Sequence, residues 1–312
     1  MKAGRPVFEN LVFEGGGVRG IAYAGALKAL EERGFLSGIR RVAGASAGAF
    51  AALLLSLGRS SEGLEQALRA IHFKTLEDKP NPLRLATHYG LYKGEVLYDW
   101  IEQQVTAEGL PADLTFEGLA RAGTLDLKVF ATDLNICNTR EFSAEKTPCA
   151  SVVGAVRASM SIPLMYAAWQ FPDGEPDDHV YVDGGVAYNY PINAFDDCAD
   201  MASTLGFCFV PGQPAGEGDM LGNVAALNNL FDYTKSLFAV IRSTQSIDFE
   251  RDPEQVHRSV LIDDLGCRAT DLDLTEADFD RLYASGYQAT VQYLDARYRT
   301  DHVKAGGLQD VS

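Results

Sequence analysis

The 312-residue chain contains no continuous apolar run of the roughly 18 residues that a membrane-spanning helix needs. Its first residues, MKAGRP, lead directly into a strand-like run and lack the apolar segment of a secretory signal. These two absences predict a cytoplasmic protein without a transmembrane helix. Export by a route that needs no signal peptide stays open.

Cysteine and metal-binding patterns are also scarce. The five cysteines are odd in number and show no close pairing. No Cys/His spacing suggests zinc, and no EF-hand loop suggests calcium. We expect reduced, mostly buried thiols, and chemistry that uses neither a metal nor another cofactor.

Basic residues are too few for a nucleic-acid partner. Lys and Arg number 27 against 43 Asp and Glu, which gives a formal net charge of −16. Nucleic-acid binding needs a basic footprint, so this class is excluded. Strong attraction of the whole surface to anionic membranes is disfavoured for the same reason. The 46% of hydrophobic and 22% of charged residues are ordinary for a globular domain.

The chain does have a short serine motif, Gly44-Ala45-Ser46-Ala47-Gly48. It follows the apolar run 41–43 and opens a helix of small apolar residues over 49–57. Such a strand-to-helix elbow projects the serine hydroxyl out of a sheet, beside a helix N-terminus that favours developing negative charge. The pattern therefore predicts a nucleophilic serine.

A second glycine cluster, residues 14–20 (EGGGVRG), follows the apolar run 11–13. It precedes a helical apolar pattern that ends near Gly34. A glycine-rich turn between a strand and a helix presents free backbone N–H groups in one direction. In an acyl hydrolase these groups stabilise the oxyanion of the tetrahedral intermediate.

The same cluster fits the dinucleotide fingerprint G-x-G-x-x-G through Gly15, Gly17 and Gly20. That interpretation needs an acidic residue at the end of the second strand, where this chain has Gly44-Ala45-Ser46. Nucleotide binding is therefore disfavoured. A tight turn without a ligand is a further interpretation of the cluster.

An aspartate followed by two glycines, Asp183-Gly184-Gly185, ends the apolar run 180–182. A carboxylate at the end of a strand lies at the edge where ligands bind in parallel α/β sheets. Burial raises the pKa of a carboxylate and makes it a better base near neutral pH. The alternative is that Asp183 only caps the turn, since Asp-Gly is a common turn dipeptide.

Together these three elements resemble the patatin-like phospholipases, in the order of that family. Two further stretches look like family signatures, residues 131–135 (ATDLN) and 157–163 (RASMSIP). The resemblance runs from about Leu11 to about Pro191, and a weaker likeness continues to the C-terminus.

The resemblance implies a catalytic Ser–Asp dyad in place of a triad, with Ser46 as nucleophile and Asp183 as base. Arg19 is expected to anchor its loop through an ion pair, with contact to a phosphate as the alternative. The remaining site residues that the resemblance implies are the oxyanion loop Gly15, Gly16, Gly17, Val18, Arg19 and Gly20, the elbow Gly44, Ala45, Ala47 and Gly48, and the base loop Gly184 and Gly185.

We therefore expect a lipid acyl hydrolase of the phospholipase A type that acts on phospholipid or other lipid esters. A short-chain carboxylesterase on the same dyad is one alternative. The other is an activator-dependent interaction protein recruited to a membrane. Peripheral membrane contact and a protein activator are both compatible with the sequence.

The histidines distinguish a dyad from a triad. In the chain order of α/β-hydrolases the histidine follows the acid, so only His257 and His302 qualify. Neither lies in a glycine-rich loop, and we expect both at the surface. His179 begins the strand that leads to Asp183, at the wrong end to reach Ser46.

Residues 72–93 mix aromatic, proline and basic side chains, which suits a lid or a loop at a lipid interface. An ordinary long connection packed on the core is the alternative.

Alternating strands and helices predict a three-layer α/β/α sandwich with a mostly parallel sheet. Residues 8–200 form the expected catalytic core, 201–300 complete the same domain with strands and helices, and 301–312 form a flexible tail. Helices are predicted over 147–158, over 223–246, and from a capping box at Thr275 to about Tyr298. The second of these helices should turn inward the side chains of Leu227, Leu230, Phe231, Leu237 and Val240. Strands are predicted over 205–210 and 259–262, a Gly/Pro linker over 211–222, and a solvated acidic loop over 263–280.

Overall fold

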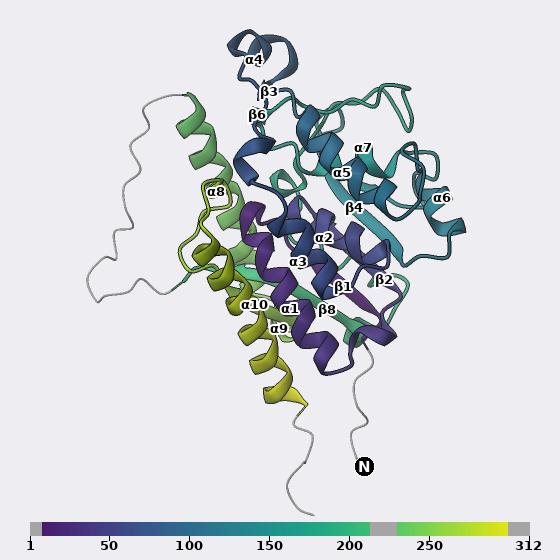
Figure 1. The fold of residues 1–312 in the computed structure, drawn as a ribbon, viewed down its shortest axis with the longest axis vertical. Helices are drawn as coiled ribbons and strands as arrows, with labels where there is room; N and C mark the ends of the chain where they lie inside the picture. The colour runs from purple at the N-terminus through teal and green to yellow at the C-terminus, as the bar shows by residue number, and fades with distance from the viewer. Residues whose placement is uncertain (1–7, 213–229, 299–312) are drawn as a thin grey trace, which may run out of the picture.

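A computed structural model of the chain, which describes residues 8–212 and 230–298, contains a seven-stranded sheet between layers of helices (Figure 1). The strand order is β5-β4-β2-β1-β8-β9, and β7 pairs with the far end of β4. β1, β2, β4, β8 and β9 are parallel to one another, so the predicted sheet is confirmed. The strands of this sheet are β1 (Asn10–Phe13), β2 (Arg41–Ala45), β4 (Asp126–Asp133), β5 (Asn138–Phe142), β7 (Tyr181–Val182), β8 (Thr204–Val210) and β9 (Ser259–Asp263).

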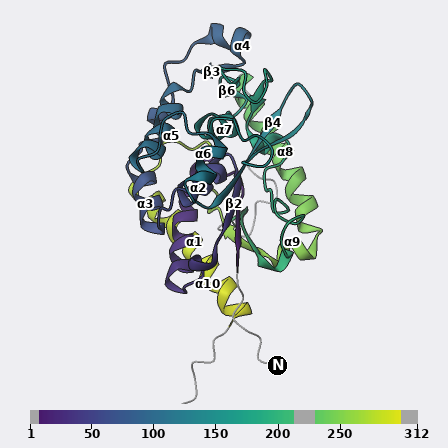
Figure 2. The ribbon, with the colours of Figure 1, turned by 90° about the vertical axis from the view of Figure 1, so that its right-hand side faces the viewer.

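Helices cover both faces of the sheet. Viewed along the sheet, α8 and α9 lie on one side, while α1, α3, α5 and α10 lie on the other (Figure 2). A separate two-stranded ribbon of β3 (Gly90–Tyr92) and β6 (Leu164–Tyr166) lies at the end of the molecule that carries α4 (Figure 1). The helices are α1 (Ile21–Glu32), α2 (Ala47–Ser56), α3 (Ser61–Arg69), α4 (Pro82–His88), α5 (Glu95–Ala107), α6 (Phe116–Arg121), α7 (Val152–Ser159), α8 (Leu230–Glu250), α9 (Pro253–His257) and α10 (Glu276–Arg297).

The central strands are buried on both faces, as their almost continuous apolar sequences predict. In β1, Leu11 and Phe13 belong to the larger core beneath α1 and α2. Val12 points the other way, into a smaller core with Ile192 and Phe195. This alternation follows from the two-residue period of a strand. Because β1 and β2 are parallel neighbours, their carboxyl ends and the loops that follow them lie side by side.

The strand before Asp183, β7, runs antiparallel to its neighbour β4. β4 is longer than β2: Ala45 at the end of β2 pairs with Phe130, and β4 continues to Asp133. The last two residues of β4 pair with β7 in antiparallel register. β7 therefore approaches the end of β2 from beyond the sheet edge and delivers Asp183 there.

One predicted helix start was wrong, and another lies outside the described residues. α7 begins at Val152, capped by Ser151, whose Oγ accepts the Gly154 N–H at 3.1 Å. Thr147 cannot cap it because its hydroxyl is bonded within the preceding turn, where it accepts from the Ser143 N–H at 3.1 Å. The described part of α8 begins at Leu230, and residues 213–229 lie outside the described residues.

The predicted inner face of α8 was also wrong in part. Leu237 and Val240 are 47% and 62% exposed, because α8 turns its opposite face to the loop after Asp183. Leu227 and the side chains of Leu230 and Phe231 are outside the described residues.

The C-terminal elements match their predictions closely. β8 and β9 occupy the predicted strands, and α10 begins with the Thr275–Asp278 capping box and runs to Arg297. The expectation of mostly buried thiols was wrong. Cys137, Cys149 and Cys198 are exposed, and Cys208 is buried. No helix within the described ranges is long and apolar enough to cross a bilayer. Residues 301–312 lie outside those ranges.

Candidate active site

Ser46 lies on a sharp turn between β2 and α2. Its backbone φ of 52° and ψ of −125° lie in a region that a residue with a side chain rarely adopts. The turn is tight because β2 and α2 approach closely: a Cβ on Gly44 would lie 2.3 Å from the Gly48 carbonyl. This geometry is that of a nucleophile elbow, which exposes the serine hydroxyl at the edge of the sheet.

The Ser46 hydroxyl contacts the carboxylate of Asp183. Ser46 Oγ donates a hydrogen bond to Asp183 Oδ2 at 2.6 Å, and both residues are buried. Asp183 Oδ1 accepts the Gly185 N–H at 2.8 Å, so this aspartate also caps the short turn that follows it. The Asp183 carbonyl accepts from Thr132 Oγ1 at 2.9 Å, which fixes the loop to β4. The structure thus brings together the predicted nucleophile and the predicted base.

The amide of Ser46 is already engaged. It donates to Ser159 Oγ at 2.8 Å, and Ser159 in turn donates to the Phe130 carbonyl at 2.6 Å. Ser159 belongs to the second of the predicted signature stretches. It therefore holds the elbow from behind and leaves the Ser46 side chain free to bond to Asp183.

The glycine-rich loop beside Ser46 contains two backbone amides that donate no hydrogen bond to another described residue. The N–H groups of Gly15, Val18 and Arg19 donate to the carbonyls of Asn189, Ala269 and Gly16. Gly20 lies within the short 3-10 helix Gly17–Gly20. Within the described residues, the N–H groups of Gly16 and Gly17 have no hydrogen-bond partner. These two are the donors that an oxyanion could use.

Arg19 anchors the glycine-rich loop through an ion pair, as the sequence analysis expected in preference to contact with a phosphate. Its Nη1 lies 3.0 Å from Asp264 Oδ2, and its Nε donates to the Gly16 carbonyl at 3.2 Å. The ion pair joins the loop to residues 264–275, the segment between β9 and α10. Gly17, with φ of 56°, lies directly under this segment: a Cβ there would be 2.0 Å from the Ala269 carbonyl.

The 264–275 segment is therefore more than a solvated loop, which corrects that part of the sequence analysis. It forms one wall of an apolar cavity of about 60 Å³ beside Ser46. Leu272, within the acidic sequence, was the signal that could have indicated a buried side. The side chains that line the cavity besides Ser46, Ala47 and the glycine-rich loop are Phe50, Ala51, Leu64, Leu68, Phe73, Leu76, Leu97, Trp100, Met160, Ile162, Met165, Tyr166, Ala269, Thr270 and Leu272.

Sequence reasoning missed a polar network that connects the two loops. Asn189 Nδ2 donates to Glu14 Oε1 at 2.6 Å and to the Gly15 carbonyl at 3.2 Å. Glu14 Oε2 accepts the Phe209 N–H at 2.6 Å, so this buried carboxylate is held on both sides. Gln245 on α8 bonds to the carbonyls of Gly185 and Val186 and accepts the Asn189 N–H at 2.8 Å. These residues fix the base loop relative to the oxyanion loop.

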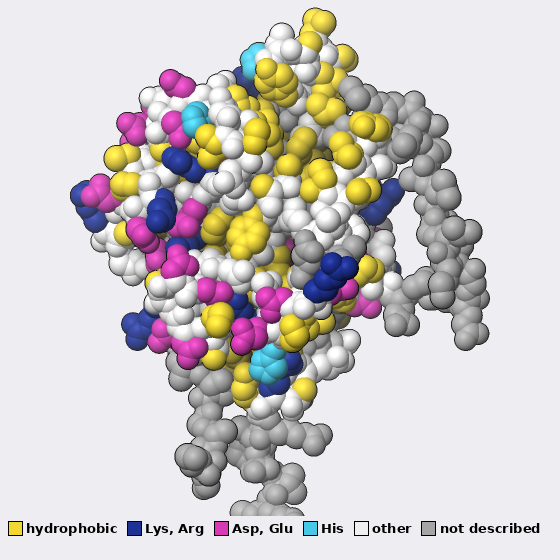
Figure 3. All heavy atoms as spheres, turned by 180° about the vertical axis from the view of Figure 1, so that it is seen from behind, with side chains coloured by type: hydrophobic (Ala, Val, Ile, Leu, Met, Phe, Trp, Pro, Cys, Tyr) yellow, Lys and Arg dark blue, Asp and Glu magenta, His cyan; other side chains and the backbone are white. Residues whose placement is uncertain are grey.

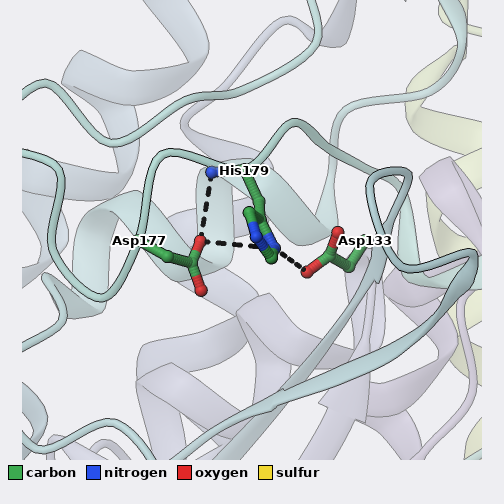
Figure 4. Close-up of side chains that lie close together, drawn as sticks. All are labelled: Asp133, Asp177 and His179. Atoms are coloured by element: carbon green, nitrogen blue, oxygen red, sulfur yellow. Dashed lines mark hydrogen bonds and ion pairs between the residues drawn. The ribbon is translucent and has the colours of Figure 1, made fainter.

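The histidines take no part in the Ser46–Asp183 contact within the described residues. His257 ends α9, and its carbonyl accepts from Tyr293 Oη at 3.0 Å. His302 lies outside the described residues. His179 Nδ1 bonds to Asp133 Oδ2 at 2.7 Å, and Asp177 Oδ1 lies 3.7 Å away (Figure 4). The hydrogen bond to Asp133 raises the pKa of His179 above its usual value.

Asp133, Asp177 and His179 could each offer one ligand atom to a metal ion, with these atoms within 4.8 Å of one another. Each of these three side chains already has hydrogen-bond partners in the protein. Asp133 Oδ1 accepts the N–H groups of Asn135 and Ile136, and Asp177 bonds to Arg140 and to Tyr181. The cluster is thus neutralised from within and ties β7 to the end of β4 (Figure 4).

A mostly parallel sheet with a serine on a strand-to-helix elbow is the architecture of an α/β ester hydrolase. The family model described as patatin-like phospholipase matches residues 11–196. The chain therefore belongs to the patatin-like phospholipase family and is a lipid ester hydrolase.

Curated relatives come from viruses and bacteria. A protein of Acanthamoeba polyphaga mimivirus is 27% identical over 292 residues, which cover 92% of this chain and 93% of the relative. The YqhO protein of Bacillus subtilis is 32% identical over 199 residues, 59% of this chain and 65% of the relative. A protein of invertebrate iridescent virus 6 named as a probable lipid hydrolase is 27% identical, covering 60% of this chain and 62% of the relative.

Two solved structures share the fold. VipD from Legionella pneumophila superposes with a TM-score of 0.60 at 17% identity, over 93% of this chain and 67% of VipD. ExoU from Pseudomonas aeruginosa, in its complex with SpcU, gives a TM-score of 0.50 at 19% identity. That match covers 95% of this chain and 53% of ExoU, so the chain spans about half the length of ExoU.

Proposed function

We propose that the protein is a phospholipase of the A type, which hydrolyses carboxylic ester bonds of phospholipids through an acyl-enzyme on Ser46. The observation that carries the proposal is the 2.6 Å hydrogen bond from Ser46 Oγ to Asp183 Oδ2 beside an apolar cavity. Membership of the patatin-like phospholipase family and the relative named as a probable lipid hydrolase support a lipid ester as substrate.

The first half of the reaction forms the acyl-enzyme. Asp183 Oδ2 accepts the hydroxyl proton as Ser46 Oγ attacks the ester carbonyl carbon. The carbonyl oxygen becomes an oxyanion and accepts hydrogen bonds from the N–H groups of Gly16 and Gly17. When the intermediate collapses, the ester C–O bond breaks and the proton passes from Asp183 to the leaving alcohol, a lysophospholipid.

The second half releases the fatty acid. A water molecule enters the site, gives a proton to Asp183 and attacks the acyl carbon. The oxyanion forms again on the same two amides. Its collapse breaks the bond to Ser46 Oγ, which regains the proton from Asp183. All groups in both halves come from the chain, the substrate and water.

The test is labelling with an alkyl fluorophosphonate, followed by intact mass. We expect one adduct on the wild type, none on Ser46→Ala, and labelling of Asp183→Asn slower by about 10²- to 10⁴-fold, as for loss of a general base. Ser56→Ala is the matched control, because Ser56 ends the helix that follows Ser46 and its hydroxyl donates to the Leu53 carbonyl. An adduct that persists on Ser46→Ala would contradict the proposal. A wild type that stays unlabelled would instead favour the activator-dependent interaction protein.

A short-chain carboxylesterase is the second candidate, and the size of the cavity favours it. The cavity of about 60 Å³ is much smaller than the cavity of about 150 Å³ that holds benzene in an engineered protein. A long acyl chain needs the 264–275 segment or the surrounding side chains to move. Rates on p-nitrophenyl esters from butyrate to palmitate, with phospholipid vesicles beside them, distinguish the two candidates.

A further inference from the structure

We propose that one end of the molecule, formed by residues 79–92 and the outer face of α8, docks on a phospholipid bilayer. We call it the docking end. The inference rests on the proposed function, since it assigns the surface through which that enzyme takes its substrate. The proposed contact is with the surface of the bilayer.

The helix α4 exposes large apolar side chains at this end. None of its residues is buried, Leu83 is 80% exposed, and Tyr89 directly after the helix is 57% exposed. Asn81 caps the helix and Pro82 occupies its first turn, so the helix is locally specified although it packs little. A defined helix that leaves such side chains in water is typical of a surface that binds something apolar.

The outer face of α8 continues the apolar surface. Tyr233, Leu237 and Val240 follow at intervals of four and three residues, which places them on one face of the helix. All three are exposed, at 53%, 47% and 62%. α8 packs against β6, β6 pairs with β3, and β3 leads back to α4, so the two helices flank one ribbon (Figures 1 and 2).

The charges near α4 fit phospholipid headgroups. Residues 72–93 contain four basic and two acidic side chains, a net +2 in a chain whose total is −16. Within the described residues, Lys79 and Arg84 form no ion pair. Seen from behind, hydrophobic side chains gather over the upper part of the molecule, while acidic ones lie mostly on its left and lower parts (Figure 3). An apolar end with few acidic residues, and with basic side chains that form no ion pair within the described residues, is complementary to a lipid surface that carries phosphates.

The docking end is continuous with the cavity beside Ser46. Gly90 and Tyr92 of β3 pair with Leu164 and Tyr166 of β6. Met165 and Tyr166 of the same ribbon line the cavity. Arg157 fixes the base of the ribbon, since its guanidinium donates to the carbonyls of Gly94 and Lys93 at 3.0 Å. A lipid that leaves the bilayer here enters the cavity along one ribbon.

The test is sedimentation of Ser46→Ala protein with vesicles, so that binding is measured without hydrolysis. Vesicles of phosphatidylcholine alone are compared with vesicles that also contain phosphatidylglycerol. We expect Leu83→Glu to weaken binding to both at least about tenfold, since a leucine side chain leaves the interface and a charge replaces it. Lys79→Gln with Arg84→Gln should weaken binding by about tenfold or more only where phosphatidylglycerol is present. Leu261→Glu, an exposed leucine on the edge strand β9, is the control and should bind like its parent.

Activity on a soluble butyrate ester separates this inference from the proposed function. Leu83→Glu in the otherwise wild-type chain should keep that activity while its hydrolysis of vesicles falls by about the loss in binding. Wild-type binding by Leu83→Glu, or an equal loss in Leu261→Glu, would overturn the docking end. So would a chain that sediments with neither vesicle. If the wild type binds vesicles through this end but hydrolyses no ester, the docking end stands and the proposed function fails.

Discussion

Asn189 lies between the two loops that flank Ser46, with its amide group bonded to Glu14 and to the Gly15 carbonyl. Removing it leaves a buried carboxylate oxygen and a buried carbonyl without that donor. Such a loss costs about 1–3 kcal/mol of stability. It also frees the oxyanion loop to move relative to Asp183.

We therefore predict that Asn189→Ala lowers kcat/KM on a soluble ester by about 10- to 100-fold, the effect of a misplacement on the scale of 1 Å. The fall should lie mainly in kcat, because Asn189 is outside the cavity. Urea unfolding measures the stability loss in parallel. Asn138→Ala, an exposed asparagine that accepts only from its neighbour Thr139, is the control. An unchanged kcat in Asn189→Ala would contradict a positioning role.

At the scale of elements, the close approach of β2 to α2 makes the elbow. Gly44→Ala introduces a Cβ 2.3 Å from the Gly48 backbone, which no side-chain movement relieves. We predict a loss of more than about 3 kcal/mol in the free energy of unfolding, as for severe overpacking. Gly63→Ala in α3 is the milder comparison, because its Cβ would lie 3.2 Å from Arg59 Cβ, and we expect a change of less than about 1 kcal/mol. Urea denaturation of both variants measures the difference, and an equal loss in the two would contradict the role of the elbow.

We expect the hydrogen bond from His179 to Asp133 to support the contact between β7 and the end of β4 most strongly when His179 is protonated. Because the hydrogen bond to Asp133 raises the pKa of His179, folding favours its charged form. This stabilisation is fully present below the unfolded pKa of about 6.5 and is lost as pH rises through the folded pKa. Asp177 supports the charged form, and Arg140 opposes it.

We predict that the Tm of the wild type exceeds that of His179→Asn most at pH 6, and that the difference shrinks by pH 8.5. Calorimetry of both proteins in matched buffers measures it. A difference that stays constant with pH would mean that His179 acts only through its shape.

At the scale of the whole molecule, local sequence predicted the parts of the site that are locally determined. The elbow at Ser46 and the turn at residues 14–20 each depend on glycines within a few positions, so their backbone could be anticipated. The capping box at Thr275 is equally local. The pairing of Ser46 with Asp183, which lie 137 residues apart, needed the family resemblance as well.

The features that sequence reasoning missed depend on long-range contacts. The start of α7 was misplaced because the Thr147 hydroxyl bonds to Ser143. The helical period of α8 was visible, but not which side of it would meet the base loop, so Leu237 and Val240 were placed inward. The direction of β7 depends on β4 extending beyond β2. The Glu14–Asn189–Gln245 network joins three separate elements, and no short motif marks it.

The family model ends at residue 196, but the sheet continues beyond it. All four residues of β1 pair with β8, and α1 crosses α10 closely at Gly25 and Gly286. We predict that a chain shortened to residues 1–200 exposes the edge of β1 and the face of α1 that packs on α10, and fails to fold, although one shortened to residues 1–300 stays folded. Soluble yield and cooperative thermal unfolding measure this. A folded 1–200 protein would mean that the two predicted parts are separate domains.

The wall formed by Ala269, Thr270 and Leu272 has a consequence for how such enzymes diversify. The proposed nucleophile, base and amide donors are all encoded before residue 196, whereas this wall is encoded more than 70 residues later. A lineage can therefore exchange the later segment and alter the acyl chains it accepts while the reacting groups stay the same. For the same reason, libraries that randomise residues 264–275 offer a direct route to altered acyl-chain selectivity.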